Sequence, residues 1–120
     1  MRACVAGSGF AELADELVAP PLMWSESRST LHRLAVARKL SHALALAAHE
    51  RLLSAPVAAR SPRRLGTEAW QIADECGWGR TYDAEYLALA RLLGCRLVTV
   101  DGRLRRGADR LGLVVTPAEL

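Results

Sequence analysis

Residues 81–93 constrain the fold of this chain most. Their sequence carries apolar side chains at helical spacing, and Gly94 follows as a typical helix stop signal. The β-branched segment Arg96–Val100 comes next and predicts a strand. If this helix and this strand pack together, Asp83 in the first helical turn and Asp101 at the exit of the strand converge. Two converging carboxylates would form a metal site.

Helices and short strands alternate along the chain, which favours an α/β fold with a small parallel sheet. The helix content is too high for an ordinary doubly wound sheet of this length. Ser41 is predicted to cap a helix. The spacing predicts further helices over residues 10–17, 22–39, 44–53, 62–76 and 102–110, and strands or extended segments over 18–19, 56–60 and 113–115.

The composition is that of one domain with its own core. The chain has 120 residues and is 51% hydrophobic, with few aromatic residues, so leucine, alanine and valine must form the core. We find no repeat and no linker, and expect a single domain over residues 1–120. The three cysteines have neither disulfide-framework nor zinc-site spacing, so we expect reduced thiols in the cytoplasm. No apolar segment is long enough to span a membrane.

Asp83 has two interpretations. It can stabilise the positive end of its helix, which is worth about 0.3–1 kcal/mol. Alternatively, its spacing to Leu87 and Ala90 places it in line with an apolar face, with Glu85 pointing elsewhere. An acid directed towards a core needs a partner or a cation.

Asp101 and Glu26 are the other candidate acids. Each has an ordinary interpretation, Asp101 as the cap of the next helix and Glu26 as an acid in the first turn of its helix. Taken together with Asp83, they would repel one another unless a proton or a cation relieved the repulsion. Such a cluster suits Mg²⁺ or Mn²⁺, which can activate water for attack on a phosphodiester.

Other polar residues give weaker signals. The net charge is +3, and Lys39 is the only lysine among 16 basic residues. The basic helix over residues 102–110 either lines a groove for RNA phosphates, through Arg103 and Arg106 above all, or is a solvated face. The histidines do not have metal-ligand spacing and are assigned to surface or packing: His32, His42 and His49.

The motif around Asp83 and Asp101 closely resembles the C-terminal half of PIN domains, above all VapC-type toxins of bacterial toxin–antitoxin pairs. The segment Leu17–Glu26 is similar to the part of that family that delivers its second acid. The resemblance implies a PIN-like three-layer fold and an Mg²⁺- or Mn²⁺-dependent ribonuclease. It also implies a homodimer, a VapB-like antitoxin, and metal binding by Glu26, Asp83 and Asp101.

The N-terminus departs from the family pattern. PIN domains open with a strand that ends in an aspartate, whereas Met1–Gly9 contains no acid and no recognisable strand. Asp15 lies in the following predicted helix and is no substitute. We therefore expect that the first strand and the first catalytic aspartate are missing, as in an N-terminally truncated PIN domain.

Three functional hypotheses follow. The first is an endoribonuclease toxin whose metal is held by the three acids. The second is a catalytically inactive truncated protein that acts only by binding an antitoxin or another copy of itself. The third, which is weaker, is a small helical module that binds nucleic acid through arginine side chains.

Overall fold

The computed structural model describes residues 2–5, 16–99 and 102–115. Its strands form one five-stranded sheet in which every neighbouring pair is parallel. This confirms the helix-rich α/β fold with a short parallel sheet. In spatial order the strands are β3 (Val57–Ala59), β2 (Glu16–Ala19), β1 (Arg2–Val5), β4 (Arg96–Val98) and β5 (Val114–Val115).

The expectation that the first strand is missing is wrong. Strand β1 lies in the centre of the sheet, where it pairs with β2 on one side and β4 on the other. Two parallel neighbours offer hydrogen-bonding groups to both edges of β1, so four residues are enough for a central strand. A segment this short and rich in small residues has no alternation that a sequence pattern could detect.

The helix expected over residues 10–17 is wrong at its end, because Glu16 and Leu17 belong to β2. Parallel pairing with β1 and β3 outweighs the helical spacing of this segment. The rest of that expected helix lies outside the described residues. Strand β2 then ends at Ala19, one residue before Pro20, as the sequence predicts.

The other helices lie close to their predicted positions. Ser41 caps α2 as expected, because its Oγ accepts a hydrogen bond from the Leu44 backbone N–H at 3.1 Å. Gly77 and Gly94 end α3 and α4 in the left-handed conformation that favours glycine. The bounds are α1 (Leu22–Val36), α2 (His42–Ser54), α3 (Leu65–Cys76), α4 (Tyr82–Leu93), α5 (Gly102–Ala108) and the 3₁₀ turn η1 (Asp109–Leu111).

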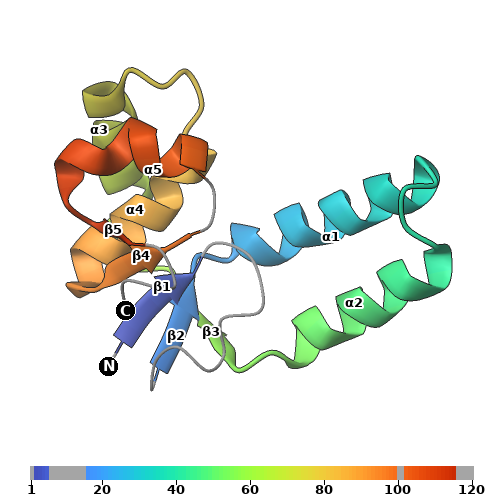
Figure 1. Ribbon diagram of the computed structural model, residues 1–120. Coiled ribbons are helices and arrows are strands. Elements are labelled where there is room, and N and C mark those ends of the chain that lie inside the picture. The colour runs from blue at the N-terminus through green and yellow to red at the C-terminus, as the bar shows by residue number, and fades with distance from the viewer. Residues whose placement is uncertain (1, 6–15, 100–101, 116–120) are drawn as a thin grey trace.

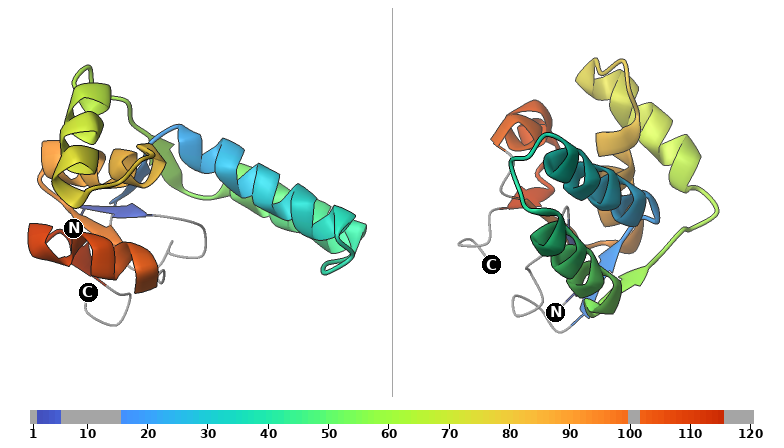
Figure 2. Two further views of the ribbon diagram at one scale, coloured as in Figure 1. Left: turned by 90° about the horizontal axis from the view of Figure 1, so that it is seen from above. Right: turned by 90° about the vertical axis from the view of Figure 1, so that its right-hand side faces the viewer.

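The molecule has two visibly different parts (Figure 1). Helices α3, α4 and α5 are gathered beside the sheet, whereas α1 and α2 pack against each other and extend away from it as a hairpin (Figure 2). None of the helices in the described ranges has the length and apolar character needed to cross a membrane.

Helix α4 is the centre of the core. It packs against α3 on one side and against β1 and β4 on the other. Five consecutive residues, Tyr86–Ala90, are buried, so the helix is enclosed on almost all sides over this stretch. Its charged side chains lie only in its first turn and its last turn.

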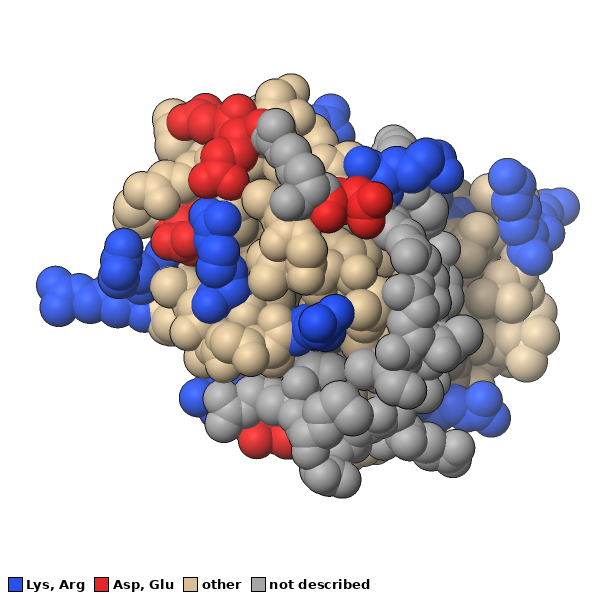
Figure 3. Space-filling view, turned by 60° about the vertical axis from the view of Figure 1, so that its left-hand side comes forward, with Lys and Arg blue, Asp and Glu red and all other residues tan. Residues whose placement is uncertain are grey.

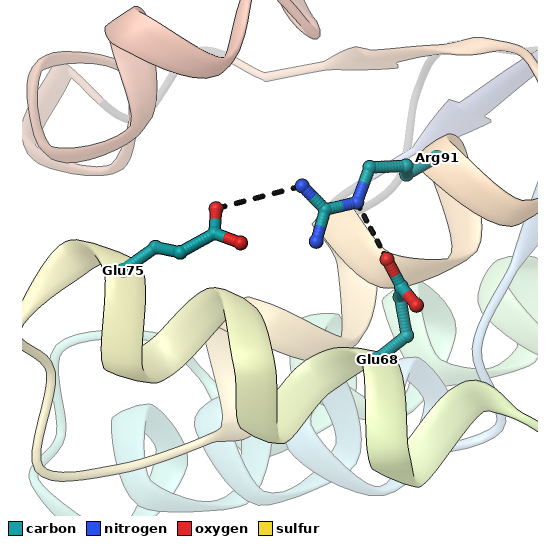
Figure 4. Close-up of polar contacts among 3 residues, drawn as sticks. All are labelled: Glu68, Glu75 and Arg91. Carbon is teal, nitrogen blue, oxygen red and sulfur yellow. Dashed lines mark hydrogen bonds and ion pairs between the residues drawn. The ribbon is translucent and has the colours of Figure 1, made fainter.

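The last turn of α4 is tied to α3 by an ion-pair cluster (Figure 4). The Nε of Arg91 donates a hydrogen bond to Oε1 of Glu68 at 2.6 Å, and its Nη1 lies 3.5 Å from Oε2 of Glu75. The Glu68 side chain is only 11% exposed, whereas that of Glu75 is 44% exposed. Glu68 therefore depends on Arg91 far more than Glu75 does.

Replacing Arg91→Met should lower the free energy of unfolding by about 1–3 kcal/mol, because it leaves the buried Glu68 carboxylate without this cation. Methionine keeps an aliphatic stem of similar length. The matched control Glu75→Gln should change the free energy by less than about 0.5 kcal/mol, since exposed ion pairs contribute little. Urea denaturation at neutral pH measures both. Equal effects of the two substitutions would contradict this assignment.

Candidate metal centre

The carboxyl edge of the sheet brings two helix starts together. Helix α1 begins at Leu22, directly after β2 ends at Ala19. Helix α4 leads through a short turn into β4, so its C-terminus lies at the amino edge and its N-terminus at the carboxyl edge. Open α/β sheets bind their ligands beyond the carboxyl ends of the strands. The early turns of α1 and α4 therefore meet where a ligand site is expected.

A hydrogen bond fixes the contact between these helices. The hydroxyl of Tyr86 on α4 donates to Oε1 of Glu26 on α1 at 2.8 Å. Tyr86 is only 5% exposed, whereas the Glu26 residue as a whole is exposed to solvent. Burial, and then the hydrogen bond to Glu26, raise the pKa of Tyr86 strongly, so its hydroxyl remains a donor. Glu26 is thus held by one oxygen at the edge of the core.

Two more acids surround this contact. Asp83 and Glu85, both half-buried in the first turn of α4, add to the rise in the pKa of Tyr86 through their negative charges. Burial, and then the charge of Glu26, raise the pKa of Glu85. The spacing places Glu85 off the apolar stripe of Asp83, yet the Glu26 charge still acts on the Glu85 carboxyl group. Spacing along α4 alone could not reveal an acid contributed by α1.

A pocket of about 350 Å³ opens beside the acids. Glu26 and Tyr86 form part of its wall together with hydroxyl-bearing Ser27 and Thr30 on α1. Its apolar wall comes from both helices of the hairpin, and its members are Leu31, Ala48 and Leu52. The pocket gives a ligand room next to Glu26 with both polar and apolar contacts.

The structure tests only part of the expected acid set. Asp101 lies outside the described residues, and so does the side chain of Arg103, whereas Arg106 is exposed on α5. Within the described ranges, no group of three or more histidine, cysteine, aspartate or glutamate side chains could hold a metal ion. Even so, the oxygen donors of Glu26 and Asp83 are of the chemical type that hard divalent cations prefer.

The histidines gather in a way that their spacing did not reveal. His32, His42 and His49 all line one groove of about 220 Å³ between α1 and α2. His49 accepts a hydrogen bond at its Nε2 from Nε of Arg28, at 3.0 Å. This bond joins the two helices, which supports the expected packing role. All three histidines lie on the two consecutive helices α1 and α2, and that placement was the available sequence signal for a shared groove.

Residues 8–110 match the PIN domain family. The chain is a PIN domain protein. PIN domains are a family of nucleases that typically depend on a metal ion. No curated protein sequence matches this chain.

Glu85 should make the stability of this PIN domain depend on pH. Because its pKa is raised in the folded state, the folded form binds the proton more tightly than the unfolded chain. Its contribution to stability is therefore complete below the ordinary glutamate pKa and is lost as pH rises through the raised pKa. With EDTA present, Glu85→Gln should melt at a higher temperature than the unaltered chain at pH 7.

This advantage of Glu85→Gln should shrink as the pH falls towards 4, because the glutamate becomes mostly protonated in both states. The exposed Glu50 on α2 provides the control, and Glu50→Gln should show no comparable pH-dependent gain. Thermal melts across pH 4 to 8 measure the effect. A Glu85→Gln variant less stable than the unaltered chain at pH 7 would contradict the proposed repulsion.

Tyr86→Phe removes the hydroxyl that holds Glu26 and leaves the buried ring in place. We expect it to lower the free energy of unfolding by about 1 kcal/mol, the usual net contribution of one hydrogen bond. The exposed Tyr82→Phe on the same helix is the matched control and should have almost no effect. Urea denaturation compares the two. A loss in both variants, or in neither, would argue against the Tyr86–Glu26 contact.

Proposed function

We propose that this chain is a metal-dependent endoribonuclease, the toxin of a VapBC-type toxin–antitoxin pair. The observation that carries the proposal is the contact of Glu26 with Tyr86, beside Asp83 and Glu85, in a chain that belongs to a nuclease family. A divalent cation relieves the repulsion between carboxylates that lie close together at the end of a sheet. Water activated by such a cation can attack a phosphodiester, and a phosphodiester is therefore the proposed substrate.

In this proposal, Glu26, Asp83 and Asp101 hold Mg²⁺ or Mn²⁺. When bound, the cation supplies an activated water and neutralises charge on the phosphate. Tyr86 orients the Glu26 carboxylate through its hydroxyl. Glu85 adds negative charge to the site and so favours cation binding. Arg103 and Arg106, on the helix after Asp101, contact the RNA backbone.

The proposed partners are a VapB-like antitoxin, RNA and a second copy of the chain, in the cytoplasm. The extended α1–α2 hairpin supports partner binding, because it offers exposed apolar side chains that a soluble partner could cover. These residues are Val36, Leu44, Leu46 and Leu53.

The second candidate is a protein that binds its partners without catalysis. It is favoured by the sequence of the N-terminus, because residues 1–9 contain no aspartate or glutamate. The central strand β1 therefore brings no acid of its own to the carboxyl edge within this segment. In this alternative, the hairpin would bind an antitoxin or another copy while the remaining acids fail to support turnover.

The two candidates differ in RNA cleavage. If the chain is the proposed nuclease, it should cleave a structured RNA in the presence of Mg²⁺ or Mn²⁺. Asp83→Asn should slow this cleavage by more than about 100-fold, because it removes a charged oxygen ligand at nearly constant shape. A gel assay with end-labelled RNA measures the rates.

The matched control is Asp109→Asn, which changes an exposed acid in η1 and should leave the rate unchanged. Circular dichroism spectra should show that both variants are folded. A folded chain that does not cleave RNA would support the binding-only alternative. Cleavage by Asp83→Asn at the unaltered rate would exclude the proposed site.

A further inference from the structure

The pocket beside Glu26 is defined by its shape and its wall rather than by charge. On the face shown in Figure 3, acidic and basic side chains of the described residues lie next to one another. The pocket has a volume of about 350 Å³, which is within the range of cavities that hold small organic groups. It lies at the base of the hairpin, where the first half of α1 and the second half of α2 meet α4 (Figure 1).

Part of the pocket wall is apolar and well held. Leu52 of α2 is buried, and Leu31 of α1 and Ala48 of α2 are half-buried in the same wall. An unstacked nucleic-acid base has a flat apolar face, which is stabilised when an aliphatic wall of this kind removes it from water.

Two hydroxyl side chains line the same pocket from α1. Ser27 and Thr30 are three residues apart and Glu26 lies four residues before Thr30, so the three side chains share one face of the helix. In the described ranges neither the Ser27 nor the Thr30 hydroxyl makes a hydrogen bond, whereas the Ser25 hydroxyl donates to the Leu22 carbonyl at 3.1 Å. A hydroxyl both donates and accepts, so Ser27 and Thr30 can pair with the polar edge of a base.

Glu26 joins this pocket to the acidic cluster. It forms part of the pocket wall, its Oε1 accepts the hydrogen bond from Tyr86 at 2.8 Å, and its charge acts on Glu85. A phosphate bound through a cation at Glu26 would therefore lie next to the pocket. The nucleotide that carries this phosphate would have its base within reach of the apolar wall and the two hydroxyls.

We propose that this pocket holds the base of an unpaired nucleotide next to the phosphodiester that is cleaved, with Ser27 and Thr30 hydrogen-bonded to the edge of that base. This inference rests on the proposed ribonuclease function and adds how the substrate is selected. A base in a duplex is stacked and paired, so only single-stranded or looped segments of RNA can place a base in the pocket. The hydroxyls then distinguish one base edge from another.

The test uses ligands that contain no phosphodiester. The unaltered chain is titrated in Mg²⁺ with each common ribonucleoside 5′-monophosphate and with ribose 5-phosphate, which has the phosphate but no base. NMR chemical shifts measure the affinities. At least one nucleotide should bind about 10-fold more tightly than ribose 5-phosphate, because a face of its base leaves water. The signals of Thr30 and Ala48 should shift with this nucleotide and not with ribose 5-phosphate.

Filling the pocket should remove this difference. Ala48→Leu adds apolar volume to the pocket wall, so its affinity for the nucleotide should fall to that for ribose 5-phosphate. The matched control is Ala47→Leu, at an exposed neighbouring position outside the pocket wall, and it should keep the difference. A melting temperature for each variant shows that the chain is folded.

Two milder substitutions test the hydroxyls. Ser27→Ala and Thr30→Val remove them with little change of volume, and each should reduce the preference for one nucleotide over the others about 2- to 10-fold, the usual effect of one hydrogen bond. Ser29→Ala, which changes an exposed hydroxyl on the same helix outside the pocket wall, should leave the preference unchanged.

Equal affinities of the unaltered chain for the nucleotides and ribose 5-phosphate would overturn the base pocket, and so would a difference that persists in folded Ala48→Leu. Mapping the cuts in an unstructured RNA separates RNA from free nucleotides as the ligand. The base that binds most tightly should flank the cuts, and cuts that ignore this base would overturn the proposal. Nucleotide binding that is lost in Ala48→Leu, in a chain that does not cleave RNA, would support the pocket and reject only the nuclease.

Discussion

Helix α4 is enclosed by α3 and the sheet along most of its length, and the rest of the structure is arranged around that enclosure. The buried run Tyr86–Ala90 leaves no polar face in the middle of the helix, so charges can occur only at its ends. At the last turn, Arg91 bridges to Glu68 and Glu75 and joins α4 to α3. At the first turn, the charges of Asp83 and Glu85 act on Tyr86, whose hydroxyl donates to Glu26 of α1.

The two ends of α4 differ in how their charges are balanced. Arg91 offsets the charge of the buried Glu68 and part of that of the exposed Glu75, which suits a structural contact. At the other end, burial and the charge of Glu26 disfavour the ionised form of Glu85. The neutral hydroxyl of Tyr86 holds Glu26 without cancelling its charge. Like charges that a rigid helix holds close together favour the binding of a cation, which is the role proposed for this end of α4.

Much of this arrangement could be predicted from the sequence, because α4 carries strong local signals. Its spacing, its glycine stop and the β-branched strand that follows predicted the helix and placed Asp83 in its first turn, as the structure has it. Strand β1 could not be predicted, since its stability comes from pairing with β2 and β4, which are distant in the chain. The role of Glu85 was missed for the same reason, because the neighbouring charge of Glu26 comes from another helix. The roles of Asp101 and Arg103 and the helix over residues 10–15 stay predictions, because these parts lie outside what the structure describes.

Glu26, held by Tyr86, and Asp83, in the first turn of the same helix as Tyr86, are proposed to hold a divalent cation. The most direct test is anomalous diffraction from crystals of the chain grown with Mn²⁺. One strong anomalous peak is expected within coordination distance of both carboxylates, with Asp101 as a further ligand. A well-ordered Glu26 and Asp83 with no peak between them at saturating Mn²⁺ would contradict the account.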